Sequence, residues 1–248
     1  METDLTGQVV AITGASSGIG EATALACVAA GAAVSLAARR SDRIEALATR
    51  ISDAGGIAVA IPADVGEEDQ ARAFVEGTKQ QLGRLDALVN NAGVMLLGPI
   101  EGADTEQWRR MVHVNIFGVI YTTHTALPIM REHGSGHIVN VSSVAGRVAR
   151  AGSGVYNLTK WGVGAFSEAL RQETVDQGIR VTLVEPGAVA TELLSHNDEQ
   201  IQAIAAKRFE GIDFLQADDI ANAILFALAQ PEHVSVNEIL VRPSKQQG

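Results

Sequence analysis

Short apolar runs alternate along this chain with longer stretches whose apolar residues recur every three or four positions. Most of the short runs are rich in β-branched residues and are apolar on both faces, which is typical of strands covered by helices on each side. The expected strands are Val9–Thr13, Ala33–Ala37, Ala58–Ile61, Ala87–Asn90, His137–Ser142, Val181–Glu185 and Glu238–Val241. The expected helices are Ile19–Ala30, Arg43–Ala54, Glu67–Gln81, Thr105–Glu132, Gly154–Asp176 and Ala217–Leu228.

Some of the expected helices carry signals at their ends. Ser41-Asp42 and Asp104 precede two helices and belong to the residue types that cap helix N-termini. Gly31 follows the first helix and is typical of a C-terminal stop. These signals support the expected boundaries.

Strict alternation of strand and helix predicts parallel strands joined by right-handed crossovers. We therefore expect an α/β protein with a doubly wound Rossmann fold, in which helices cover both faces of a parallel sheet of about seven strands. No linker rich in proline or serine, charge block or internal repeat divides the sequence. A single domain over residues 1–248 is expected.

Composition and charge exclude several classes of partner. The chain has 248 residues and a net charge of −10, so a surface that follows nucleic-acid phosphates is not expected. The start "METDLTGQ" lacks the pattern of a signal peptide, and no apolar run is long enough for a membrane span. Cys27 is the one cysteine and is expected to be a buried small hydrophobe. We expect a soluble, cytoplasmic protein with no membrane or nucleic-acid partner.

The glycine pattern at residues 14–20 has two interpretations. "GASSG" matches the elbow that presents a nucleophilic serine in hydrolases, and, extended to Gly20, it matches the turn that holds a dinucleotide at a helix N-terminus. A hydrolase elbow follows several strands, whereas this turn follows the first, and neither Asp218 nor His233 has a local signature of a triad partner. The dinucleotide interpretation is favoured; taken alone, the pattern is also compatible with an ordinary strand–helix turn.

Two further signals lie in the second half of the chain. Tyr156 and Lys160 are four residues apart in an expected helix and therefore share one of its faces. Ser143 follows a strand, at the edge where open α/β sheets bind ligands. The alternatives are a packed tyrosine with a lysine that extends to solvent, and a serine that only forms a turn.

Taken together, the motifs resemble the short-chain dehydrogenase/reductase family over nearly the whole chain. They are Thr13-Gly14-x-x-x-Gly18-x-Gly20, Asn90-Asn91-Ala92-Gly93, Asn115, Ser143, Tyr156-x-x-x-Lys160 and Pro186-Gly187, in the family's order and spacing. The segments "LAARRSDRIEAL", "NNAGVMLLGPIE" and "NEILVRP" are most similar to the NADP-dependent subset that includes clavulanic acid dehydrogenase and short hydroxy-acid dehydrogenases.

The resemblance implies an NADPH-dependent oxidoreductase that interconverts a ketone or aldehyde with an alcohol by hydride transfer. Tyr156 would be the general acid, and an ammonium one helical turn away at Lys160 would lower its pKa. Ser143 would donate a hydrogen bond to the substrate oxygen, and Asn115 would hold a water that links Lys160 to solvent. The alternative is a non-catalytic, dinucleotide-binding regulatory protein of the same fold, although such a protein needs no proton relay.

The end of the second strand indicates NADP as the cofactor. NAD enzymes of this fold place an acid there, whereas this chain has Ala38 followed by Arg39 and Arg40, whose guanidiniums suit a 2′-phosphate. Solvated arginines that lead into the next helix are the alternative, and Asp42 is interpreted as a helix cap. The expected cofactor-binding residues are Gly14, Ser16, Ser17, Gly18, Ile19, Gly20, Arg39, Arg40, Asp64, Val65, Asn91, Ala92, Gly93, Tyr156, Lys160, Pro186, Gly187, Val189 and Thr191.

A substrate-covering lid is expected at about residues 188–214. Its apolar residues at helical spacing are Ile201, Ile204, Ala205, Phe209 and Ile212. A helix docked permanently on the core is the alternative. Met95, Leu96 and Leu97 would form the opposite wall of a mainly apolar pocket. The expected substrate contacts are Met95, Ser143, Arg147, Ser153, Tyr156, Leu193 and Leu194, which leave few anchors for a charged substrate.

Two expectations concern assembly and metals. Gly162 and Gly164 weaken the helix that carries Tyr156, which suggests the close approach of a neighbouring helix; in this family that helix often belongs to another subunit. A homo-tetramer or homo-dimer is expected, with Trp161 and Phe166 packing this helix. The six histidines show no metal-ligand spacing, so no metal site is expected.

Overall fold

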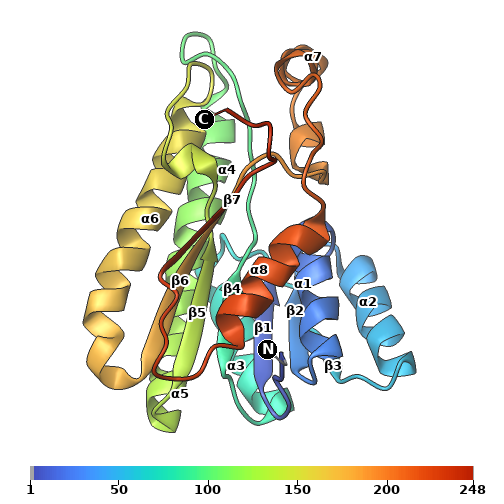
Figure 1. Ribbon diagram of the computed structural model, residues 1–248, viewed down its shortest axis with the longest axis vertical. Helices are drawn as coiled ribbons and strands as arrows, with labels where there is room; N and C mark the ends of the chain where they lie inside the picture. The colour runs from blue at the N-terminus through green and yellow to red at the C-terminus, as the bar shows by residue number, and fades with distance from the viewer. Residues whose placement is uncertain (1–2, 248) are drawn as a thin grey trace.

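The computed structural model describes residues 3–247, apart from the side chain of Ala205. Its centre is one parallel sheet of seven strands in the order β3-β2-β1-β4-β5-β6-β7 (Figure 1). The strands are β1 (Val9–Thr13), β2 (Ala33–Ala37), β3 (Ala58–Ala60), β4 (Ala87–Asn90), β5 (Gly136–Val141), β6 (Ile179–Pro186) and β7 (Glu238–Val241). The expected doubly wound sheet in a single Rossmann-like unit is therefore confirmed.

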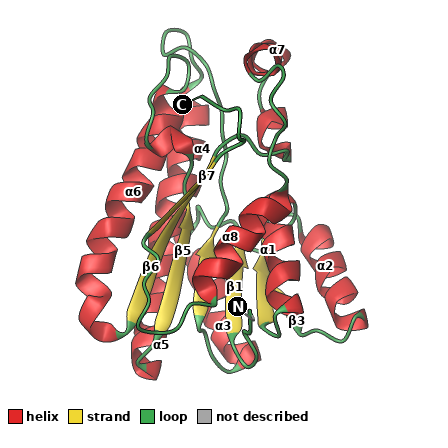
Figure 2. Ribbon diagram, in the orientation of Figure 1, coloured by secondary structure: helices red, strands yellow, loops and turns green. Residues whose placement is uncertain are grey.

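Helices cover both faces of this sheet (Figure 2). They are α1 (Gly18–Ala29), α2 (Ser41–Asp53), α3 (Glu68–Leu82), α4 (Thr105–Val112), α5 (Gly118–His133), α6 (Gly154–Thr174), α7 (Glu199–Arg208) and α8 (Ala217–Leu228). Short 3-10 turns lie at Val144–Gly146 (η2), Val175–Gln177 (η3) and Glu192–His196 (η4).

The strands divide their side chains between two apolar layers. Val10 and Ile12 of β1 pack with α1, α2 and α8, whereas Ala11 points to the layer formed by α3, α5 and α6. The same alternation occurs along β4. Both faces of these strands are therefore buried, which explains why they carry apolar residues on both faces.

The long helix expected at 105–132 is interrupted. Its first part ends as α4, five residues form a π-helical turn, η1 (His113–Phe117), and α5 follows. Asn115 lies within this turn and is buried. A π-turn inserts one residue into the helical repeat and re-aims the side chains around it, and such turns often mark functional sites.

Two expected helix caps have different outcomes. Asp104 caps α4 through a hydrogen bond from the Glu106 N–H to its carboxylate. Arg40 instead occupies the cap position of α2, and Ser41 and Asp42 are its first residues, so the interpretation of Asp42 as the cap is wrong. Asp42 lies in the first turn, where its negative charge interacts favourably with the positive end of the helix dipole.

The carboxyl ends of β1 and β4 meet where the strand order reverses. β1 pairs with β2 on one side and with β4 on the other. Helix α1, which follows β1, packs on one face of the sheet, and α3, which precedes β4, packs on the opposite face. Open α/β sheets bind ligands in the crevice above such a switch point. Figure 1 shows α7, in orange, standing clear of the main body beyond this edge.

No helix in residues 3–247 is long and apolar enough to cross a membrane. The cytoplasmic location stays a prediction.

Candidate active site

A cavity of about 660 Å³ lies along the carboxyl edge of the sheet. One end is formed by the glycine turn after β1, and the other by the segments around Tyr156 and α7. The expected site residues that line it are Gly14, Ser16, Ser17, Gly18, Ile19, Arg39, Arg40, Asp64, Val65, Asn91, Ala92, Gly93, Met95, Ser143, Ser153, Tyr156, Lys160, Pro186, Gly187, Val189, Thr191, Leu193 and Leu194. Asn115, Gly20 and Arg147 do not line it.

The glycine turn has the geometry that a close-fitting phosphate loop requires. Gly14 and Gly18 have φ angles of +67° and +56°, which L-residues with a side chain rarely adopt. A Cβ at Gly20 would collide with the carbonyl oxygen of Gly14, so this glycine allows helix and strand to approach. The amide of Asn91 donates to the Thr13 carbonyl at 2.9 Å and fixes the turn against β4.

Arg40 is tied to the same turn. Its guanidinium donates to the hydroxyls of Ser16 (3.1 and 2.8 Å) and Ser17 (2.8 Å). Arg39 is half exposed, and its guanidinium lies 3.8 Å from the carboxylate of Asp64. The two arginines therefore border one end of the cavity as cations in an otherwise acidic protein.

Glu192 is a member of this cluster that sequence reasoning missed. Its two carboxylate oxygens each accept a hydrogen bond at 2.9 Å, one from Arg40 and one from Arg43. These contacts with Arg43 and Arg40 lower the pKa of Glu192 to about 2. Glu192 is the first residue of η4. Its carboxylate therefore connects the expected lid to Arg40 and Arg43. It follows Thr191 directly in sequence, but no motif pairs it with residues 40 and 43.

Tyr156 lies in the first turn of α6, facing the cavity, and is 6% exposed. Burial raises the pKa of its phenol to about 12, and a hydrogen bond with Ser143 offsets part of this effect. The pKa of Tyr156 is thus raised in this structure, and a lowering by the Lys160 ammonium stays a prediction. Desolvation disfavours the phenolate, and the Lys160 ammonium lies 5.8 Å from the ring centre.

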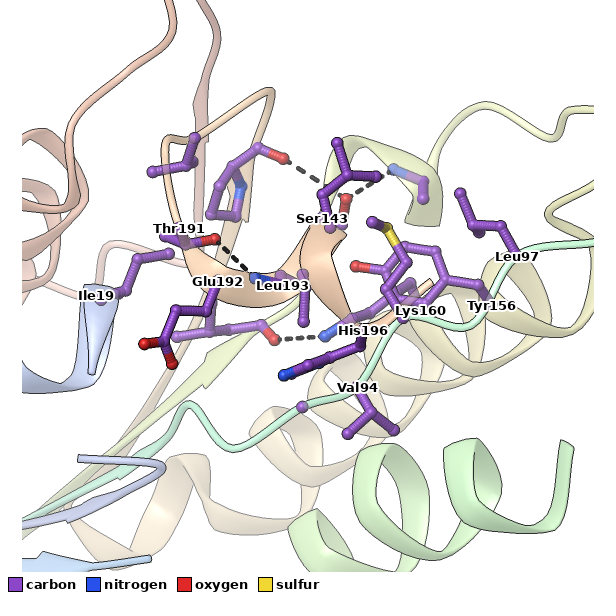
Figure 3. Close-up of a pocket in the computed structure, with 18 of the residues that line it drawn as sticks. Ile19, Val94, Leu97, Ser143, Tyr156, Lys160, Thr191, Glu192, Leu193 and His196 are labelled. Atoms are coloured by element: carbon purple, nitrogen blue, oxygen red, sulfur yellow. Dashed lines mark hydrogen bonds between the residues drawn. The ribbon is translucent and has the colours of Figure 1, made fainter. Parts of the chain in front are cut away.

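Ser143 lies at the end of β5, next to Tyr156. Its hydroxyl accepts a hydrogen bond from the Ala145 N–H at 3.1 Å and donates to the Pro186 carbonyl oxygen at 3.5 Å. These contacts fix the hydroxyl at the start of η2. Figure 3 shows Ser143, Tyr156 and Lys160 along one side of the pocket.

Lys160 is buried one turn after Tyr156 on α6. Its ammonium donates to the Val141 carbonyl oxygen at 3.0 Å. Burial lowers the pKa of Lys160 to about 8. A Cβ placed on Gly93 would lie 3.7 Å from the Lys160 Nζ and 3.5 Å from the Asn115 Oδ1, so this glycine separates the two groups.

Asn115 supports the site from behind the cavity wall. Its Oδ1 accepts from the Val94 N–H at 2.8 Å, and its Nδ2 donates to the Val94 carbonyl at 2.9 Å and to Thr159 at 3.1 Å. The side chain thus fixes the backbone after β4 against α6. The π-helical turn explains how a buried asparagine fits within an apolar helix.

Arg147 was expected near the substrate, and this is wrong. Its guanidinium forms ion pairs with Glu185 of β6 and Glu238 of β7. Glu185 is buried, so its carboxylate requires a cationic partner and draws Arg147 away from the cavity. Leu96 was expected in the pocket wall, but it is buried in the apolar cluster with Met111.

Two other arginines line the cavity. Arg150 follows η2 and Arg208 ends α7, and neither guanidinium has an acidic partner or a hydrogen bond within residues 3–247. Arg208 lies 5.7 Å from the ring centre of Phe209. The expectation that a charged substrate has few anchors is therefore corrected. The sequence favoured Arg147 as a substrate contact because its ion pairs with Glu185 and Glu238 depend on residues far along the chain.

The loop that carries Arg150 is held by Asn157, one residue after Tyr156. The Asn157 Oδ1 accepts from the Arg150 N–H at 3.2 Å and from Ser153 at 2.9 Å. Its Nδ2 donates to the Ala145 carbonyl at 2.7 Å. Asn157 thus couples the loop at residues 145–153 to the Tyr156 helix, a role that the sequence did not indicate.

The expected lid contains η4 and α7, and part of its apolar stripe faces the cavity. Ile201, Ile204 and Phe209 line the cavity, whereas Ile212 does not, and the side chain of Ala205 lies outside the described residues. The base of the lid is fixed by Asn197, which accepts from the Leu97 N–H at 2.6 Å and donates to the Met95 carbonyl at 2.9 Å. The lid function itself stays a prediction.

The glycines of α6 face residues of the same chain. A Cβ on Gly162 would lie 3.1 Å from Ile116, and one on Gly164 would lie 3.7 Å from Leu183. Gly162 therefore admits the neighbouring helical turn η1 of the same chain, and a contact with another subunit stays a prediction. Trp161 is 52% exposed instead of packing α6. In the described part of the chain, no group of three or more His, Cys, Asp or Glu side chains is arranged to hold a metal ion.

Comparisons with known proteins agree with this geometry. The family model for short chain dehydrogenases matches residues 8–202. An uncharacterized oxidoreductase from Staphylococcus saprophyticus is 43% identical, with 96% of this chain and 97% of that protein aligned. Glycine betaine reductase from Emericella nidulans is 42% identical over 96% of this chain, which spans 19% of that protein's length.

Solved structures extend the similarity to the whole fold. The closed form of serine dehydrogenase complexed with NADP⁺ is 31% identical, with a TM-score of 0.89 and 97% of each chain covered. A gluconate 5-dehydrogenase from Burkholderia cenocepacia, in complex with NADP and tartrate, is 29% identical, with a TM-score of 0.86 over 97% of this chain and 96% of that one. With its parallel sheet, glycine turn and Tyr156–Lys160 helix, the chain belongs to the short-chain dehydrogenase/reductase family and is an oxidoreductase.

Proposed function

We propose that this enzyme interconverts a carbonyl compound and an alcohol with NADPH as the hydride donor. The observation that carries the proposal is one continuous cavity that has the glycine turn and two arginines at one end and Ser143, Tyr156 and Lys160 at the other. A dinucleotide that binds the turn through its phosphates is long enough to reach Tyr156 along such a cavity. The cofactor supplies the hydride, so the protein must orient the reactants and move a proton.

The residues at the cofactor end fit a dinucleotide with a 2′-phosphate. The N-terminus of α1 and the hydroxyls of Ser16 and Ser17 suit the pyrophosphate. Arg39 is the arginine whose guanidinium has one distant anionic partner, and it suits the 2′-phosphate. The similar structures crystallised with NADP support the same choice.

At the reacting end, three side chains have separate roles. Ser143 donates a hydrogen bond to the substrate oxygen, and Tyr156 transfers its phenolic proton to that oxygen during reduction. The Lys160 ammonium stabilises the phenolate that forms. Asn115 fixes the backbone of Val94 beside Lys160 and acts as a positioning residue.

The substrate end suits a medium-sized carbonyl compound. Met95, Leu97 and Leu193 supply apolar walls, whereas Arg150 and Arg208 are the cations that an anionic group on the substrate would contact. We therefore include carbonyl compounds that carry a carboxylate among the substrates. A panel of aldehydes, ketones, β-keto esters and semialdehyde acids, with loss of NADPH absorbance as the readout, identifies the class.

The experiment that tests the cofactor assignment compares NADPH with NADH. We expect a clear preference for NADPH, and Arg39→Ala should weaken NADPH far more than NADH because only the former carries the 2′-phosphate. Equal specificity constants, or a preference for NADH, contradict the assignment. Tight NADPH binding without turnover of any carbonyl compound supports the non-catalytic alternative.

We also propose a homo-dimer or homo-tetramer that uses the outer faces of α5 and α6. Leu158 and Trp161 are one helical turn apart on α6 and are 66% and 52% exposed. Phe117 and Tyr121 stack on the neighbouring helix at 5.6 Å, and η1 contacts α6. Exposed apolar surface of this kind is typical of an interface. A monomer by light scattering at micromolar concentration overturns this proposal.

A further inference from the structure

The segment after β7 returns to the active-site edge of the sheet. Residues 242–247 pass over Gly187, where an added Cβ would collide with Gln246 and lie 3.0 Å from Pro243. A hydrogen bond from the Gln246 N–H to the Pro243 carbonyl, at 2.9 Å, folds this segment into a turn. Figure 1 shows the dark red tail above the end of β7, on the side of α4 and α6. The close packing at Gly187 fixes the path of the tail.

Gln246 brings its side chain into the wall of the cavity. Its Oε1 accepts a hydrogen bond from the Ala188 N–H at 2.9 Å, and the residue is half-buried and lines the cavity. Ala188 is the first residue of the expected lid and follows the Pro186-Gly187 pair at the end of β6. The side-chain oxygen Oε1 of Gln246 therefore holds the backbone at the point where the lid leaves the sheet.

The other half of the Gln246 amide is available to a ligand. Because Oε1 is bound to the Ala188 N–H, the orientation of the amide is set, and Nε2 carries two N–H donors. Neither donor has a partner within residues 3–247. Gln246 is half-buried and lines the cavity, so a ligand in the cavity can supply an acceptor for these donors.

Gln246 lies on the same wall as Ser143. The Ser143 hydroxyl contacts the carbonyl oxygen of Pro186, two residues before Ala188. The Ser143 hydroxyl and the Gln246 amide therefore both lie beside the short segment from Pro186 to Ala188. A ligand whose reacting oxygen binds Ser143 can present a second oxygen to Gln246.

We propose that Gln246 is a substrate-binding residue that donates from Nε2 to a second acceptor oxygen of the substrate while its Oε1 fixes the start of the lid. The inference rests on the proposed carbonyl reduction and deepens it. It favours carbonyl compounds with a second oxygen near the reacting one, such as β-keto esters and oxo acids, over simple ketones. All these substrates would make the same contacts between the reacting oxygen and Tyr156 and Ser143. The binding free energy of the second contact would then distinguish them.

One substitution separates the two halves of the amide. Gln246→Glu keeps an oxygen acceptor for the Ala188 N–H but removes the Nε2 donor, whereas Gln246→Leu removes both. Gln247→Glu introduces the same charge at an exposed neighbouring position and is the matched control. For each variant, kcat and KM are measured with a β-keto ester and with a simple ketone of similar size, and KM is measured for NADPH.

We expect Gln246→Glu to raise KM for the β-keto ester about tenfold, the effect of one lost hydrogen bond, with KM for the simple ketone changed less than about twofold. Its melting temperature and KM for NADPH should match those of the wild type and of Gln247→Glu. Gln246→Leu should also lower kcat for both substrates, because the start of the lid is no longer fixed.

Three results overturn the inference. They are unchanged kinetics for Gln246→Glu with both substrates, equal losses with both substrates, and a change confined to KM for NADPH, which would assign the donor to the cofactor. A wild-type enzyme that reduces no carbonyl compound refutes the proposed function instead, so the two failures are distinguishable.

Discussion

Tyr156 and Lys160 show how burial sets the proton chemistry of single residues. Burial raises the pKa of the Tyr156 phenol to about 12 and lowers that of the Lys160 ammonium to about 8. The Tyr156 phenol, the proposed proton donor, therefore stays protonated over the whole working range, while the Lys160 ammonium, proposed to stabilise its conjugate base, is lost in mild alkali. The two groups respond to pH separately, which makes their roles testable one at a time.

Removal of the phenolic hydroxyl should abolish turnover. Tyr156→Phe is expected to lower kcat for carbonyl reduction by ~10²–10⁴-fold, because general-acid catalysis is lost, while NADPH binding by fluorescence titration is largely unchanged. Tyr121→Phe is the matched control, since Tyr121 stacks on Phe117 outside the cavity and the substitution keeps that ring. Retention of more than about a tenth of the activity contradicts the role of Tyr156.

The pH dependence should follow Lys160. Its pKa is lowered to about 8 in the folded protein, so the ammonium is present below this pH and is lost above it. We expect kcat for reduction of a non-ionisable ketone to decline above about pH 8. Tyr156, with a pKa of about 12, does not titrate in this range. A kcat that is constant well beyond that pH shows that the Lys160 charge is not used.

At the scale of elements, the segment from Thr191 to Arg208 joins both ends of the cavity. Glu192 at its start holds Arg40 and Arg43, Asn197 binds the backbone at Met95 and Leu97, and α7 carries the apolar residues over the substrate end. Thr191 also packs on the glycine turn, 3.1 Å from the position of a Cβ on Gly18. A ligand at either end of the cavity therefore contacts the same segment.

Glu192 should oppose the binding of a 2′-phosphate. Its pKa of about 2 keeps it anionic, and it occupies one edge of the Arg40 guanidinium. We expect Glu192→Gln to tighten NADPH binding by about threefold, a modest effect because exposed ion pairs are screened, and to leave NADH binding unchanged. Hydrogen exchange across residues 188–214 should rise in the cofactor-free variant, since the lid loses an anchor.

Glu199→Gln removes an exposed acid from the same segment and is the control for overall charge. Weaker NADPH binding by Glu192→Gln shows that the ion pair closes over the cofactor instead of competing with it. For the wild type, equal protection of residues 188–214 with and without NADP⁺ and product supports a permanently docked helix.

Over the whole molecule, charge is distributed unevenly. The chain carries a net charge of −10, but the cavity is lined by five cations and two anions. The cations are Arg39, Arg40, Arg150, Lys160 and Arg208, and the anions are Asp64 and Glu192. A positive cleft in an acidic protein concentrates anionic ligands at the site and raises their association rate.

Acid should destabilise the fold through His137 on β5. Burial, with a contribution from Arg180, lowers the pKa of His137 to about 3, so the native state binds a proton less readily than the unfolded chain. The stabilisation is fully present above the unfolded pKa of about 6.5 and is lost as pH falls towards 3.

We expect this histidine to contribute a slope of up to ~1.4 kcal/mol per pH unit within that window, measured by urea unfolding. His137→Leu should flatten this part of the profile, whereas His233→Leu, at an exposed position, should not. Parallel profiles for wild type and His137→Leu contradict the assignment.

The order of strands and helices, the glycine turn and the Tyr156–Lys160 pair follow from the sequence by itself, because they depend on local periodicity and on residues a few positions apart. The predicted bounds of β1, β2, β4 and β7 are also confirmed. The interruption of the helix at 113–117 was not predicted, since its apolar period continues through Asn115 and only packing against α6 favours the extra residue.

Tertiary structure alone decided which charged and polar side chains reach the cavity. Arg147 and Arg150 are three residues apart and have similar sequence surroundings, but the buried Glu185 carboxylate binds one of them, whereas the other lines the cavity. Glu192 and Gln246 entered the site in the same way, through partners 152 and 58 residues away. Such contacts depend on how strands from distant parts of the chain are arranged in the sheet, which no local pattern encodes.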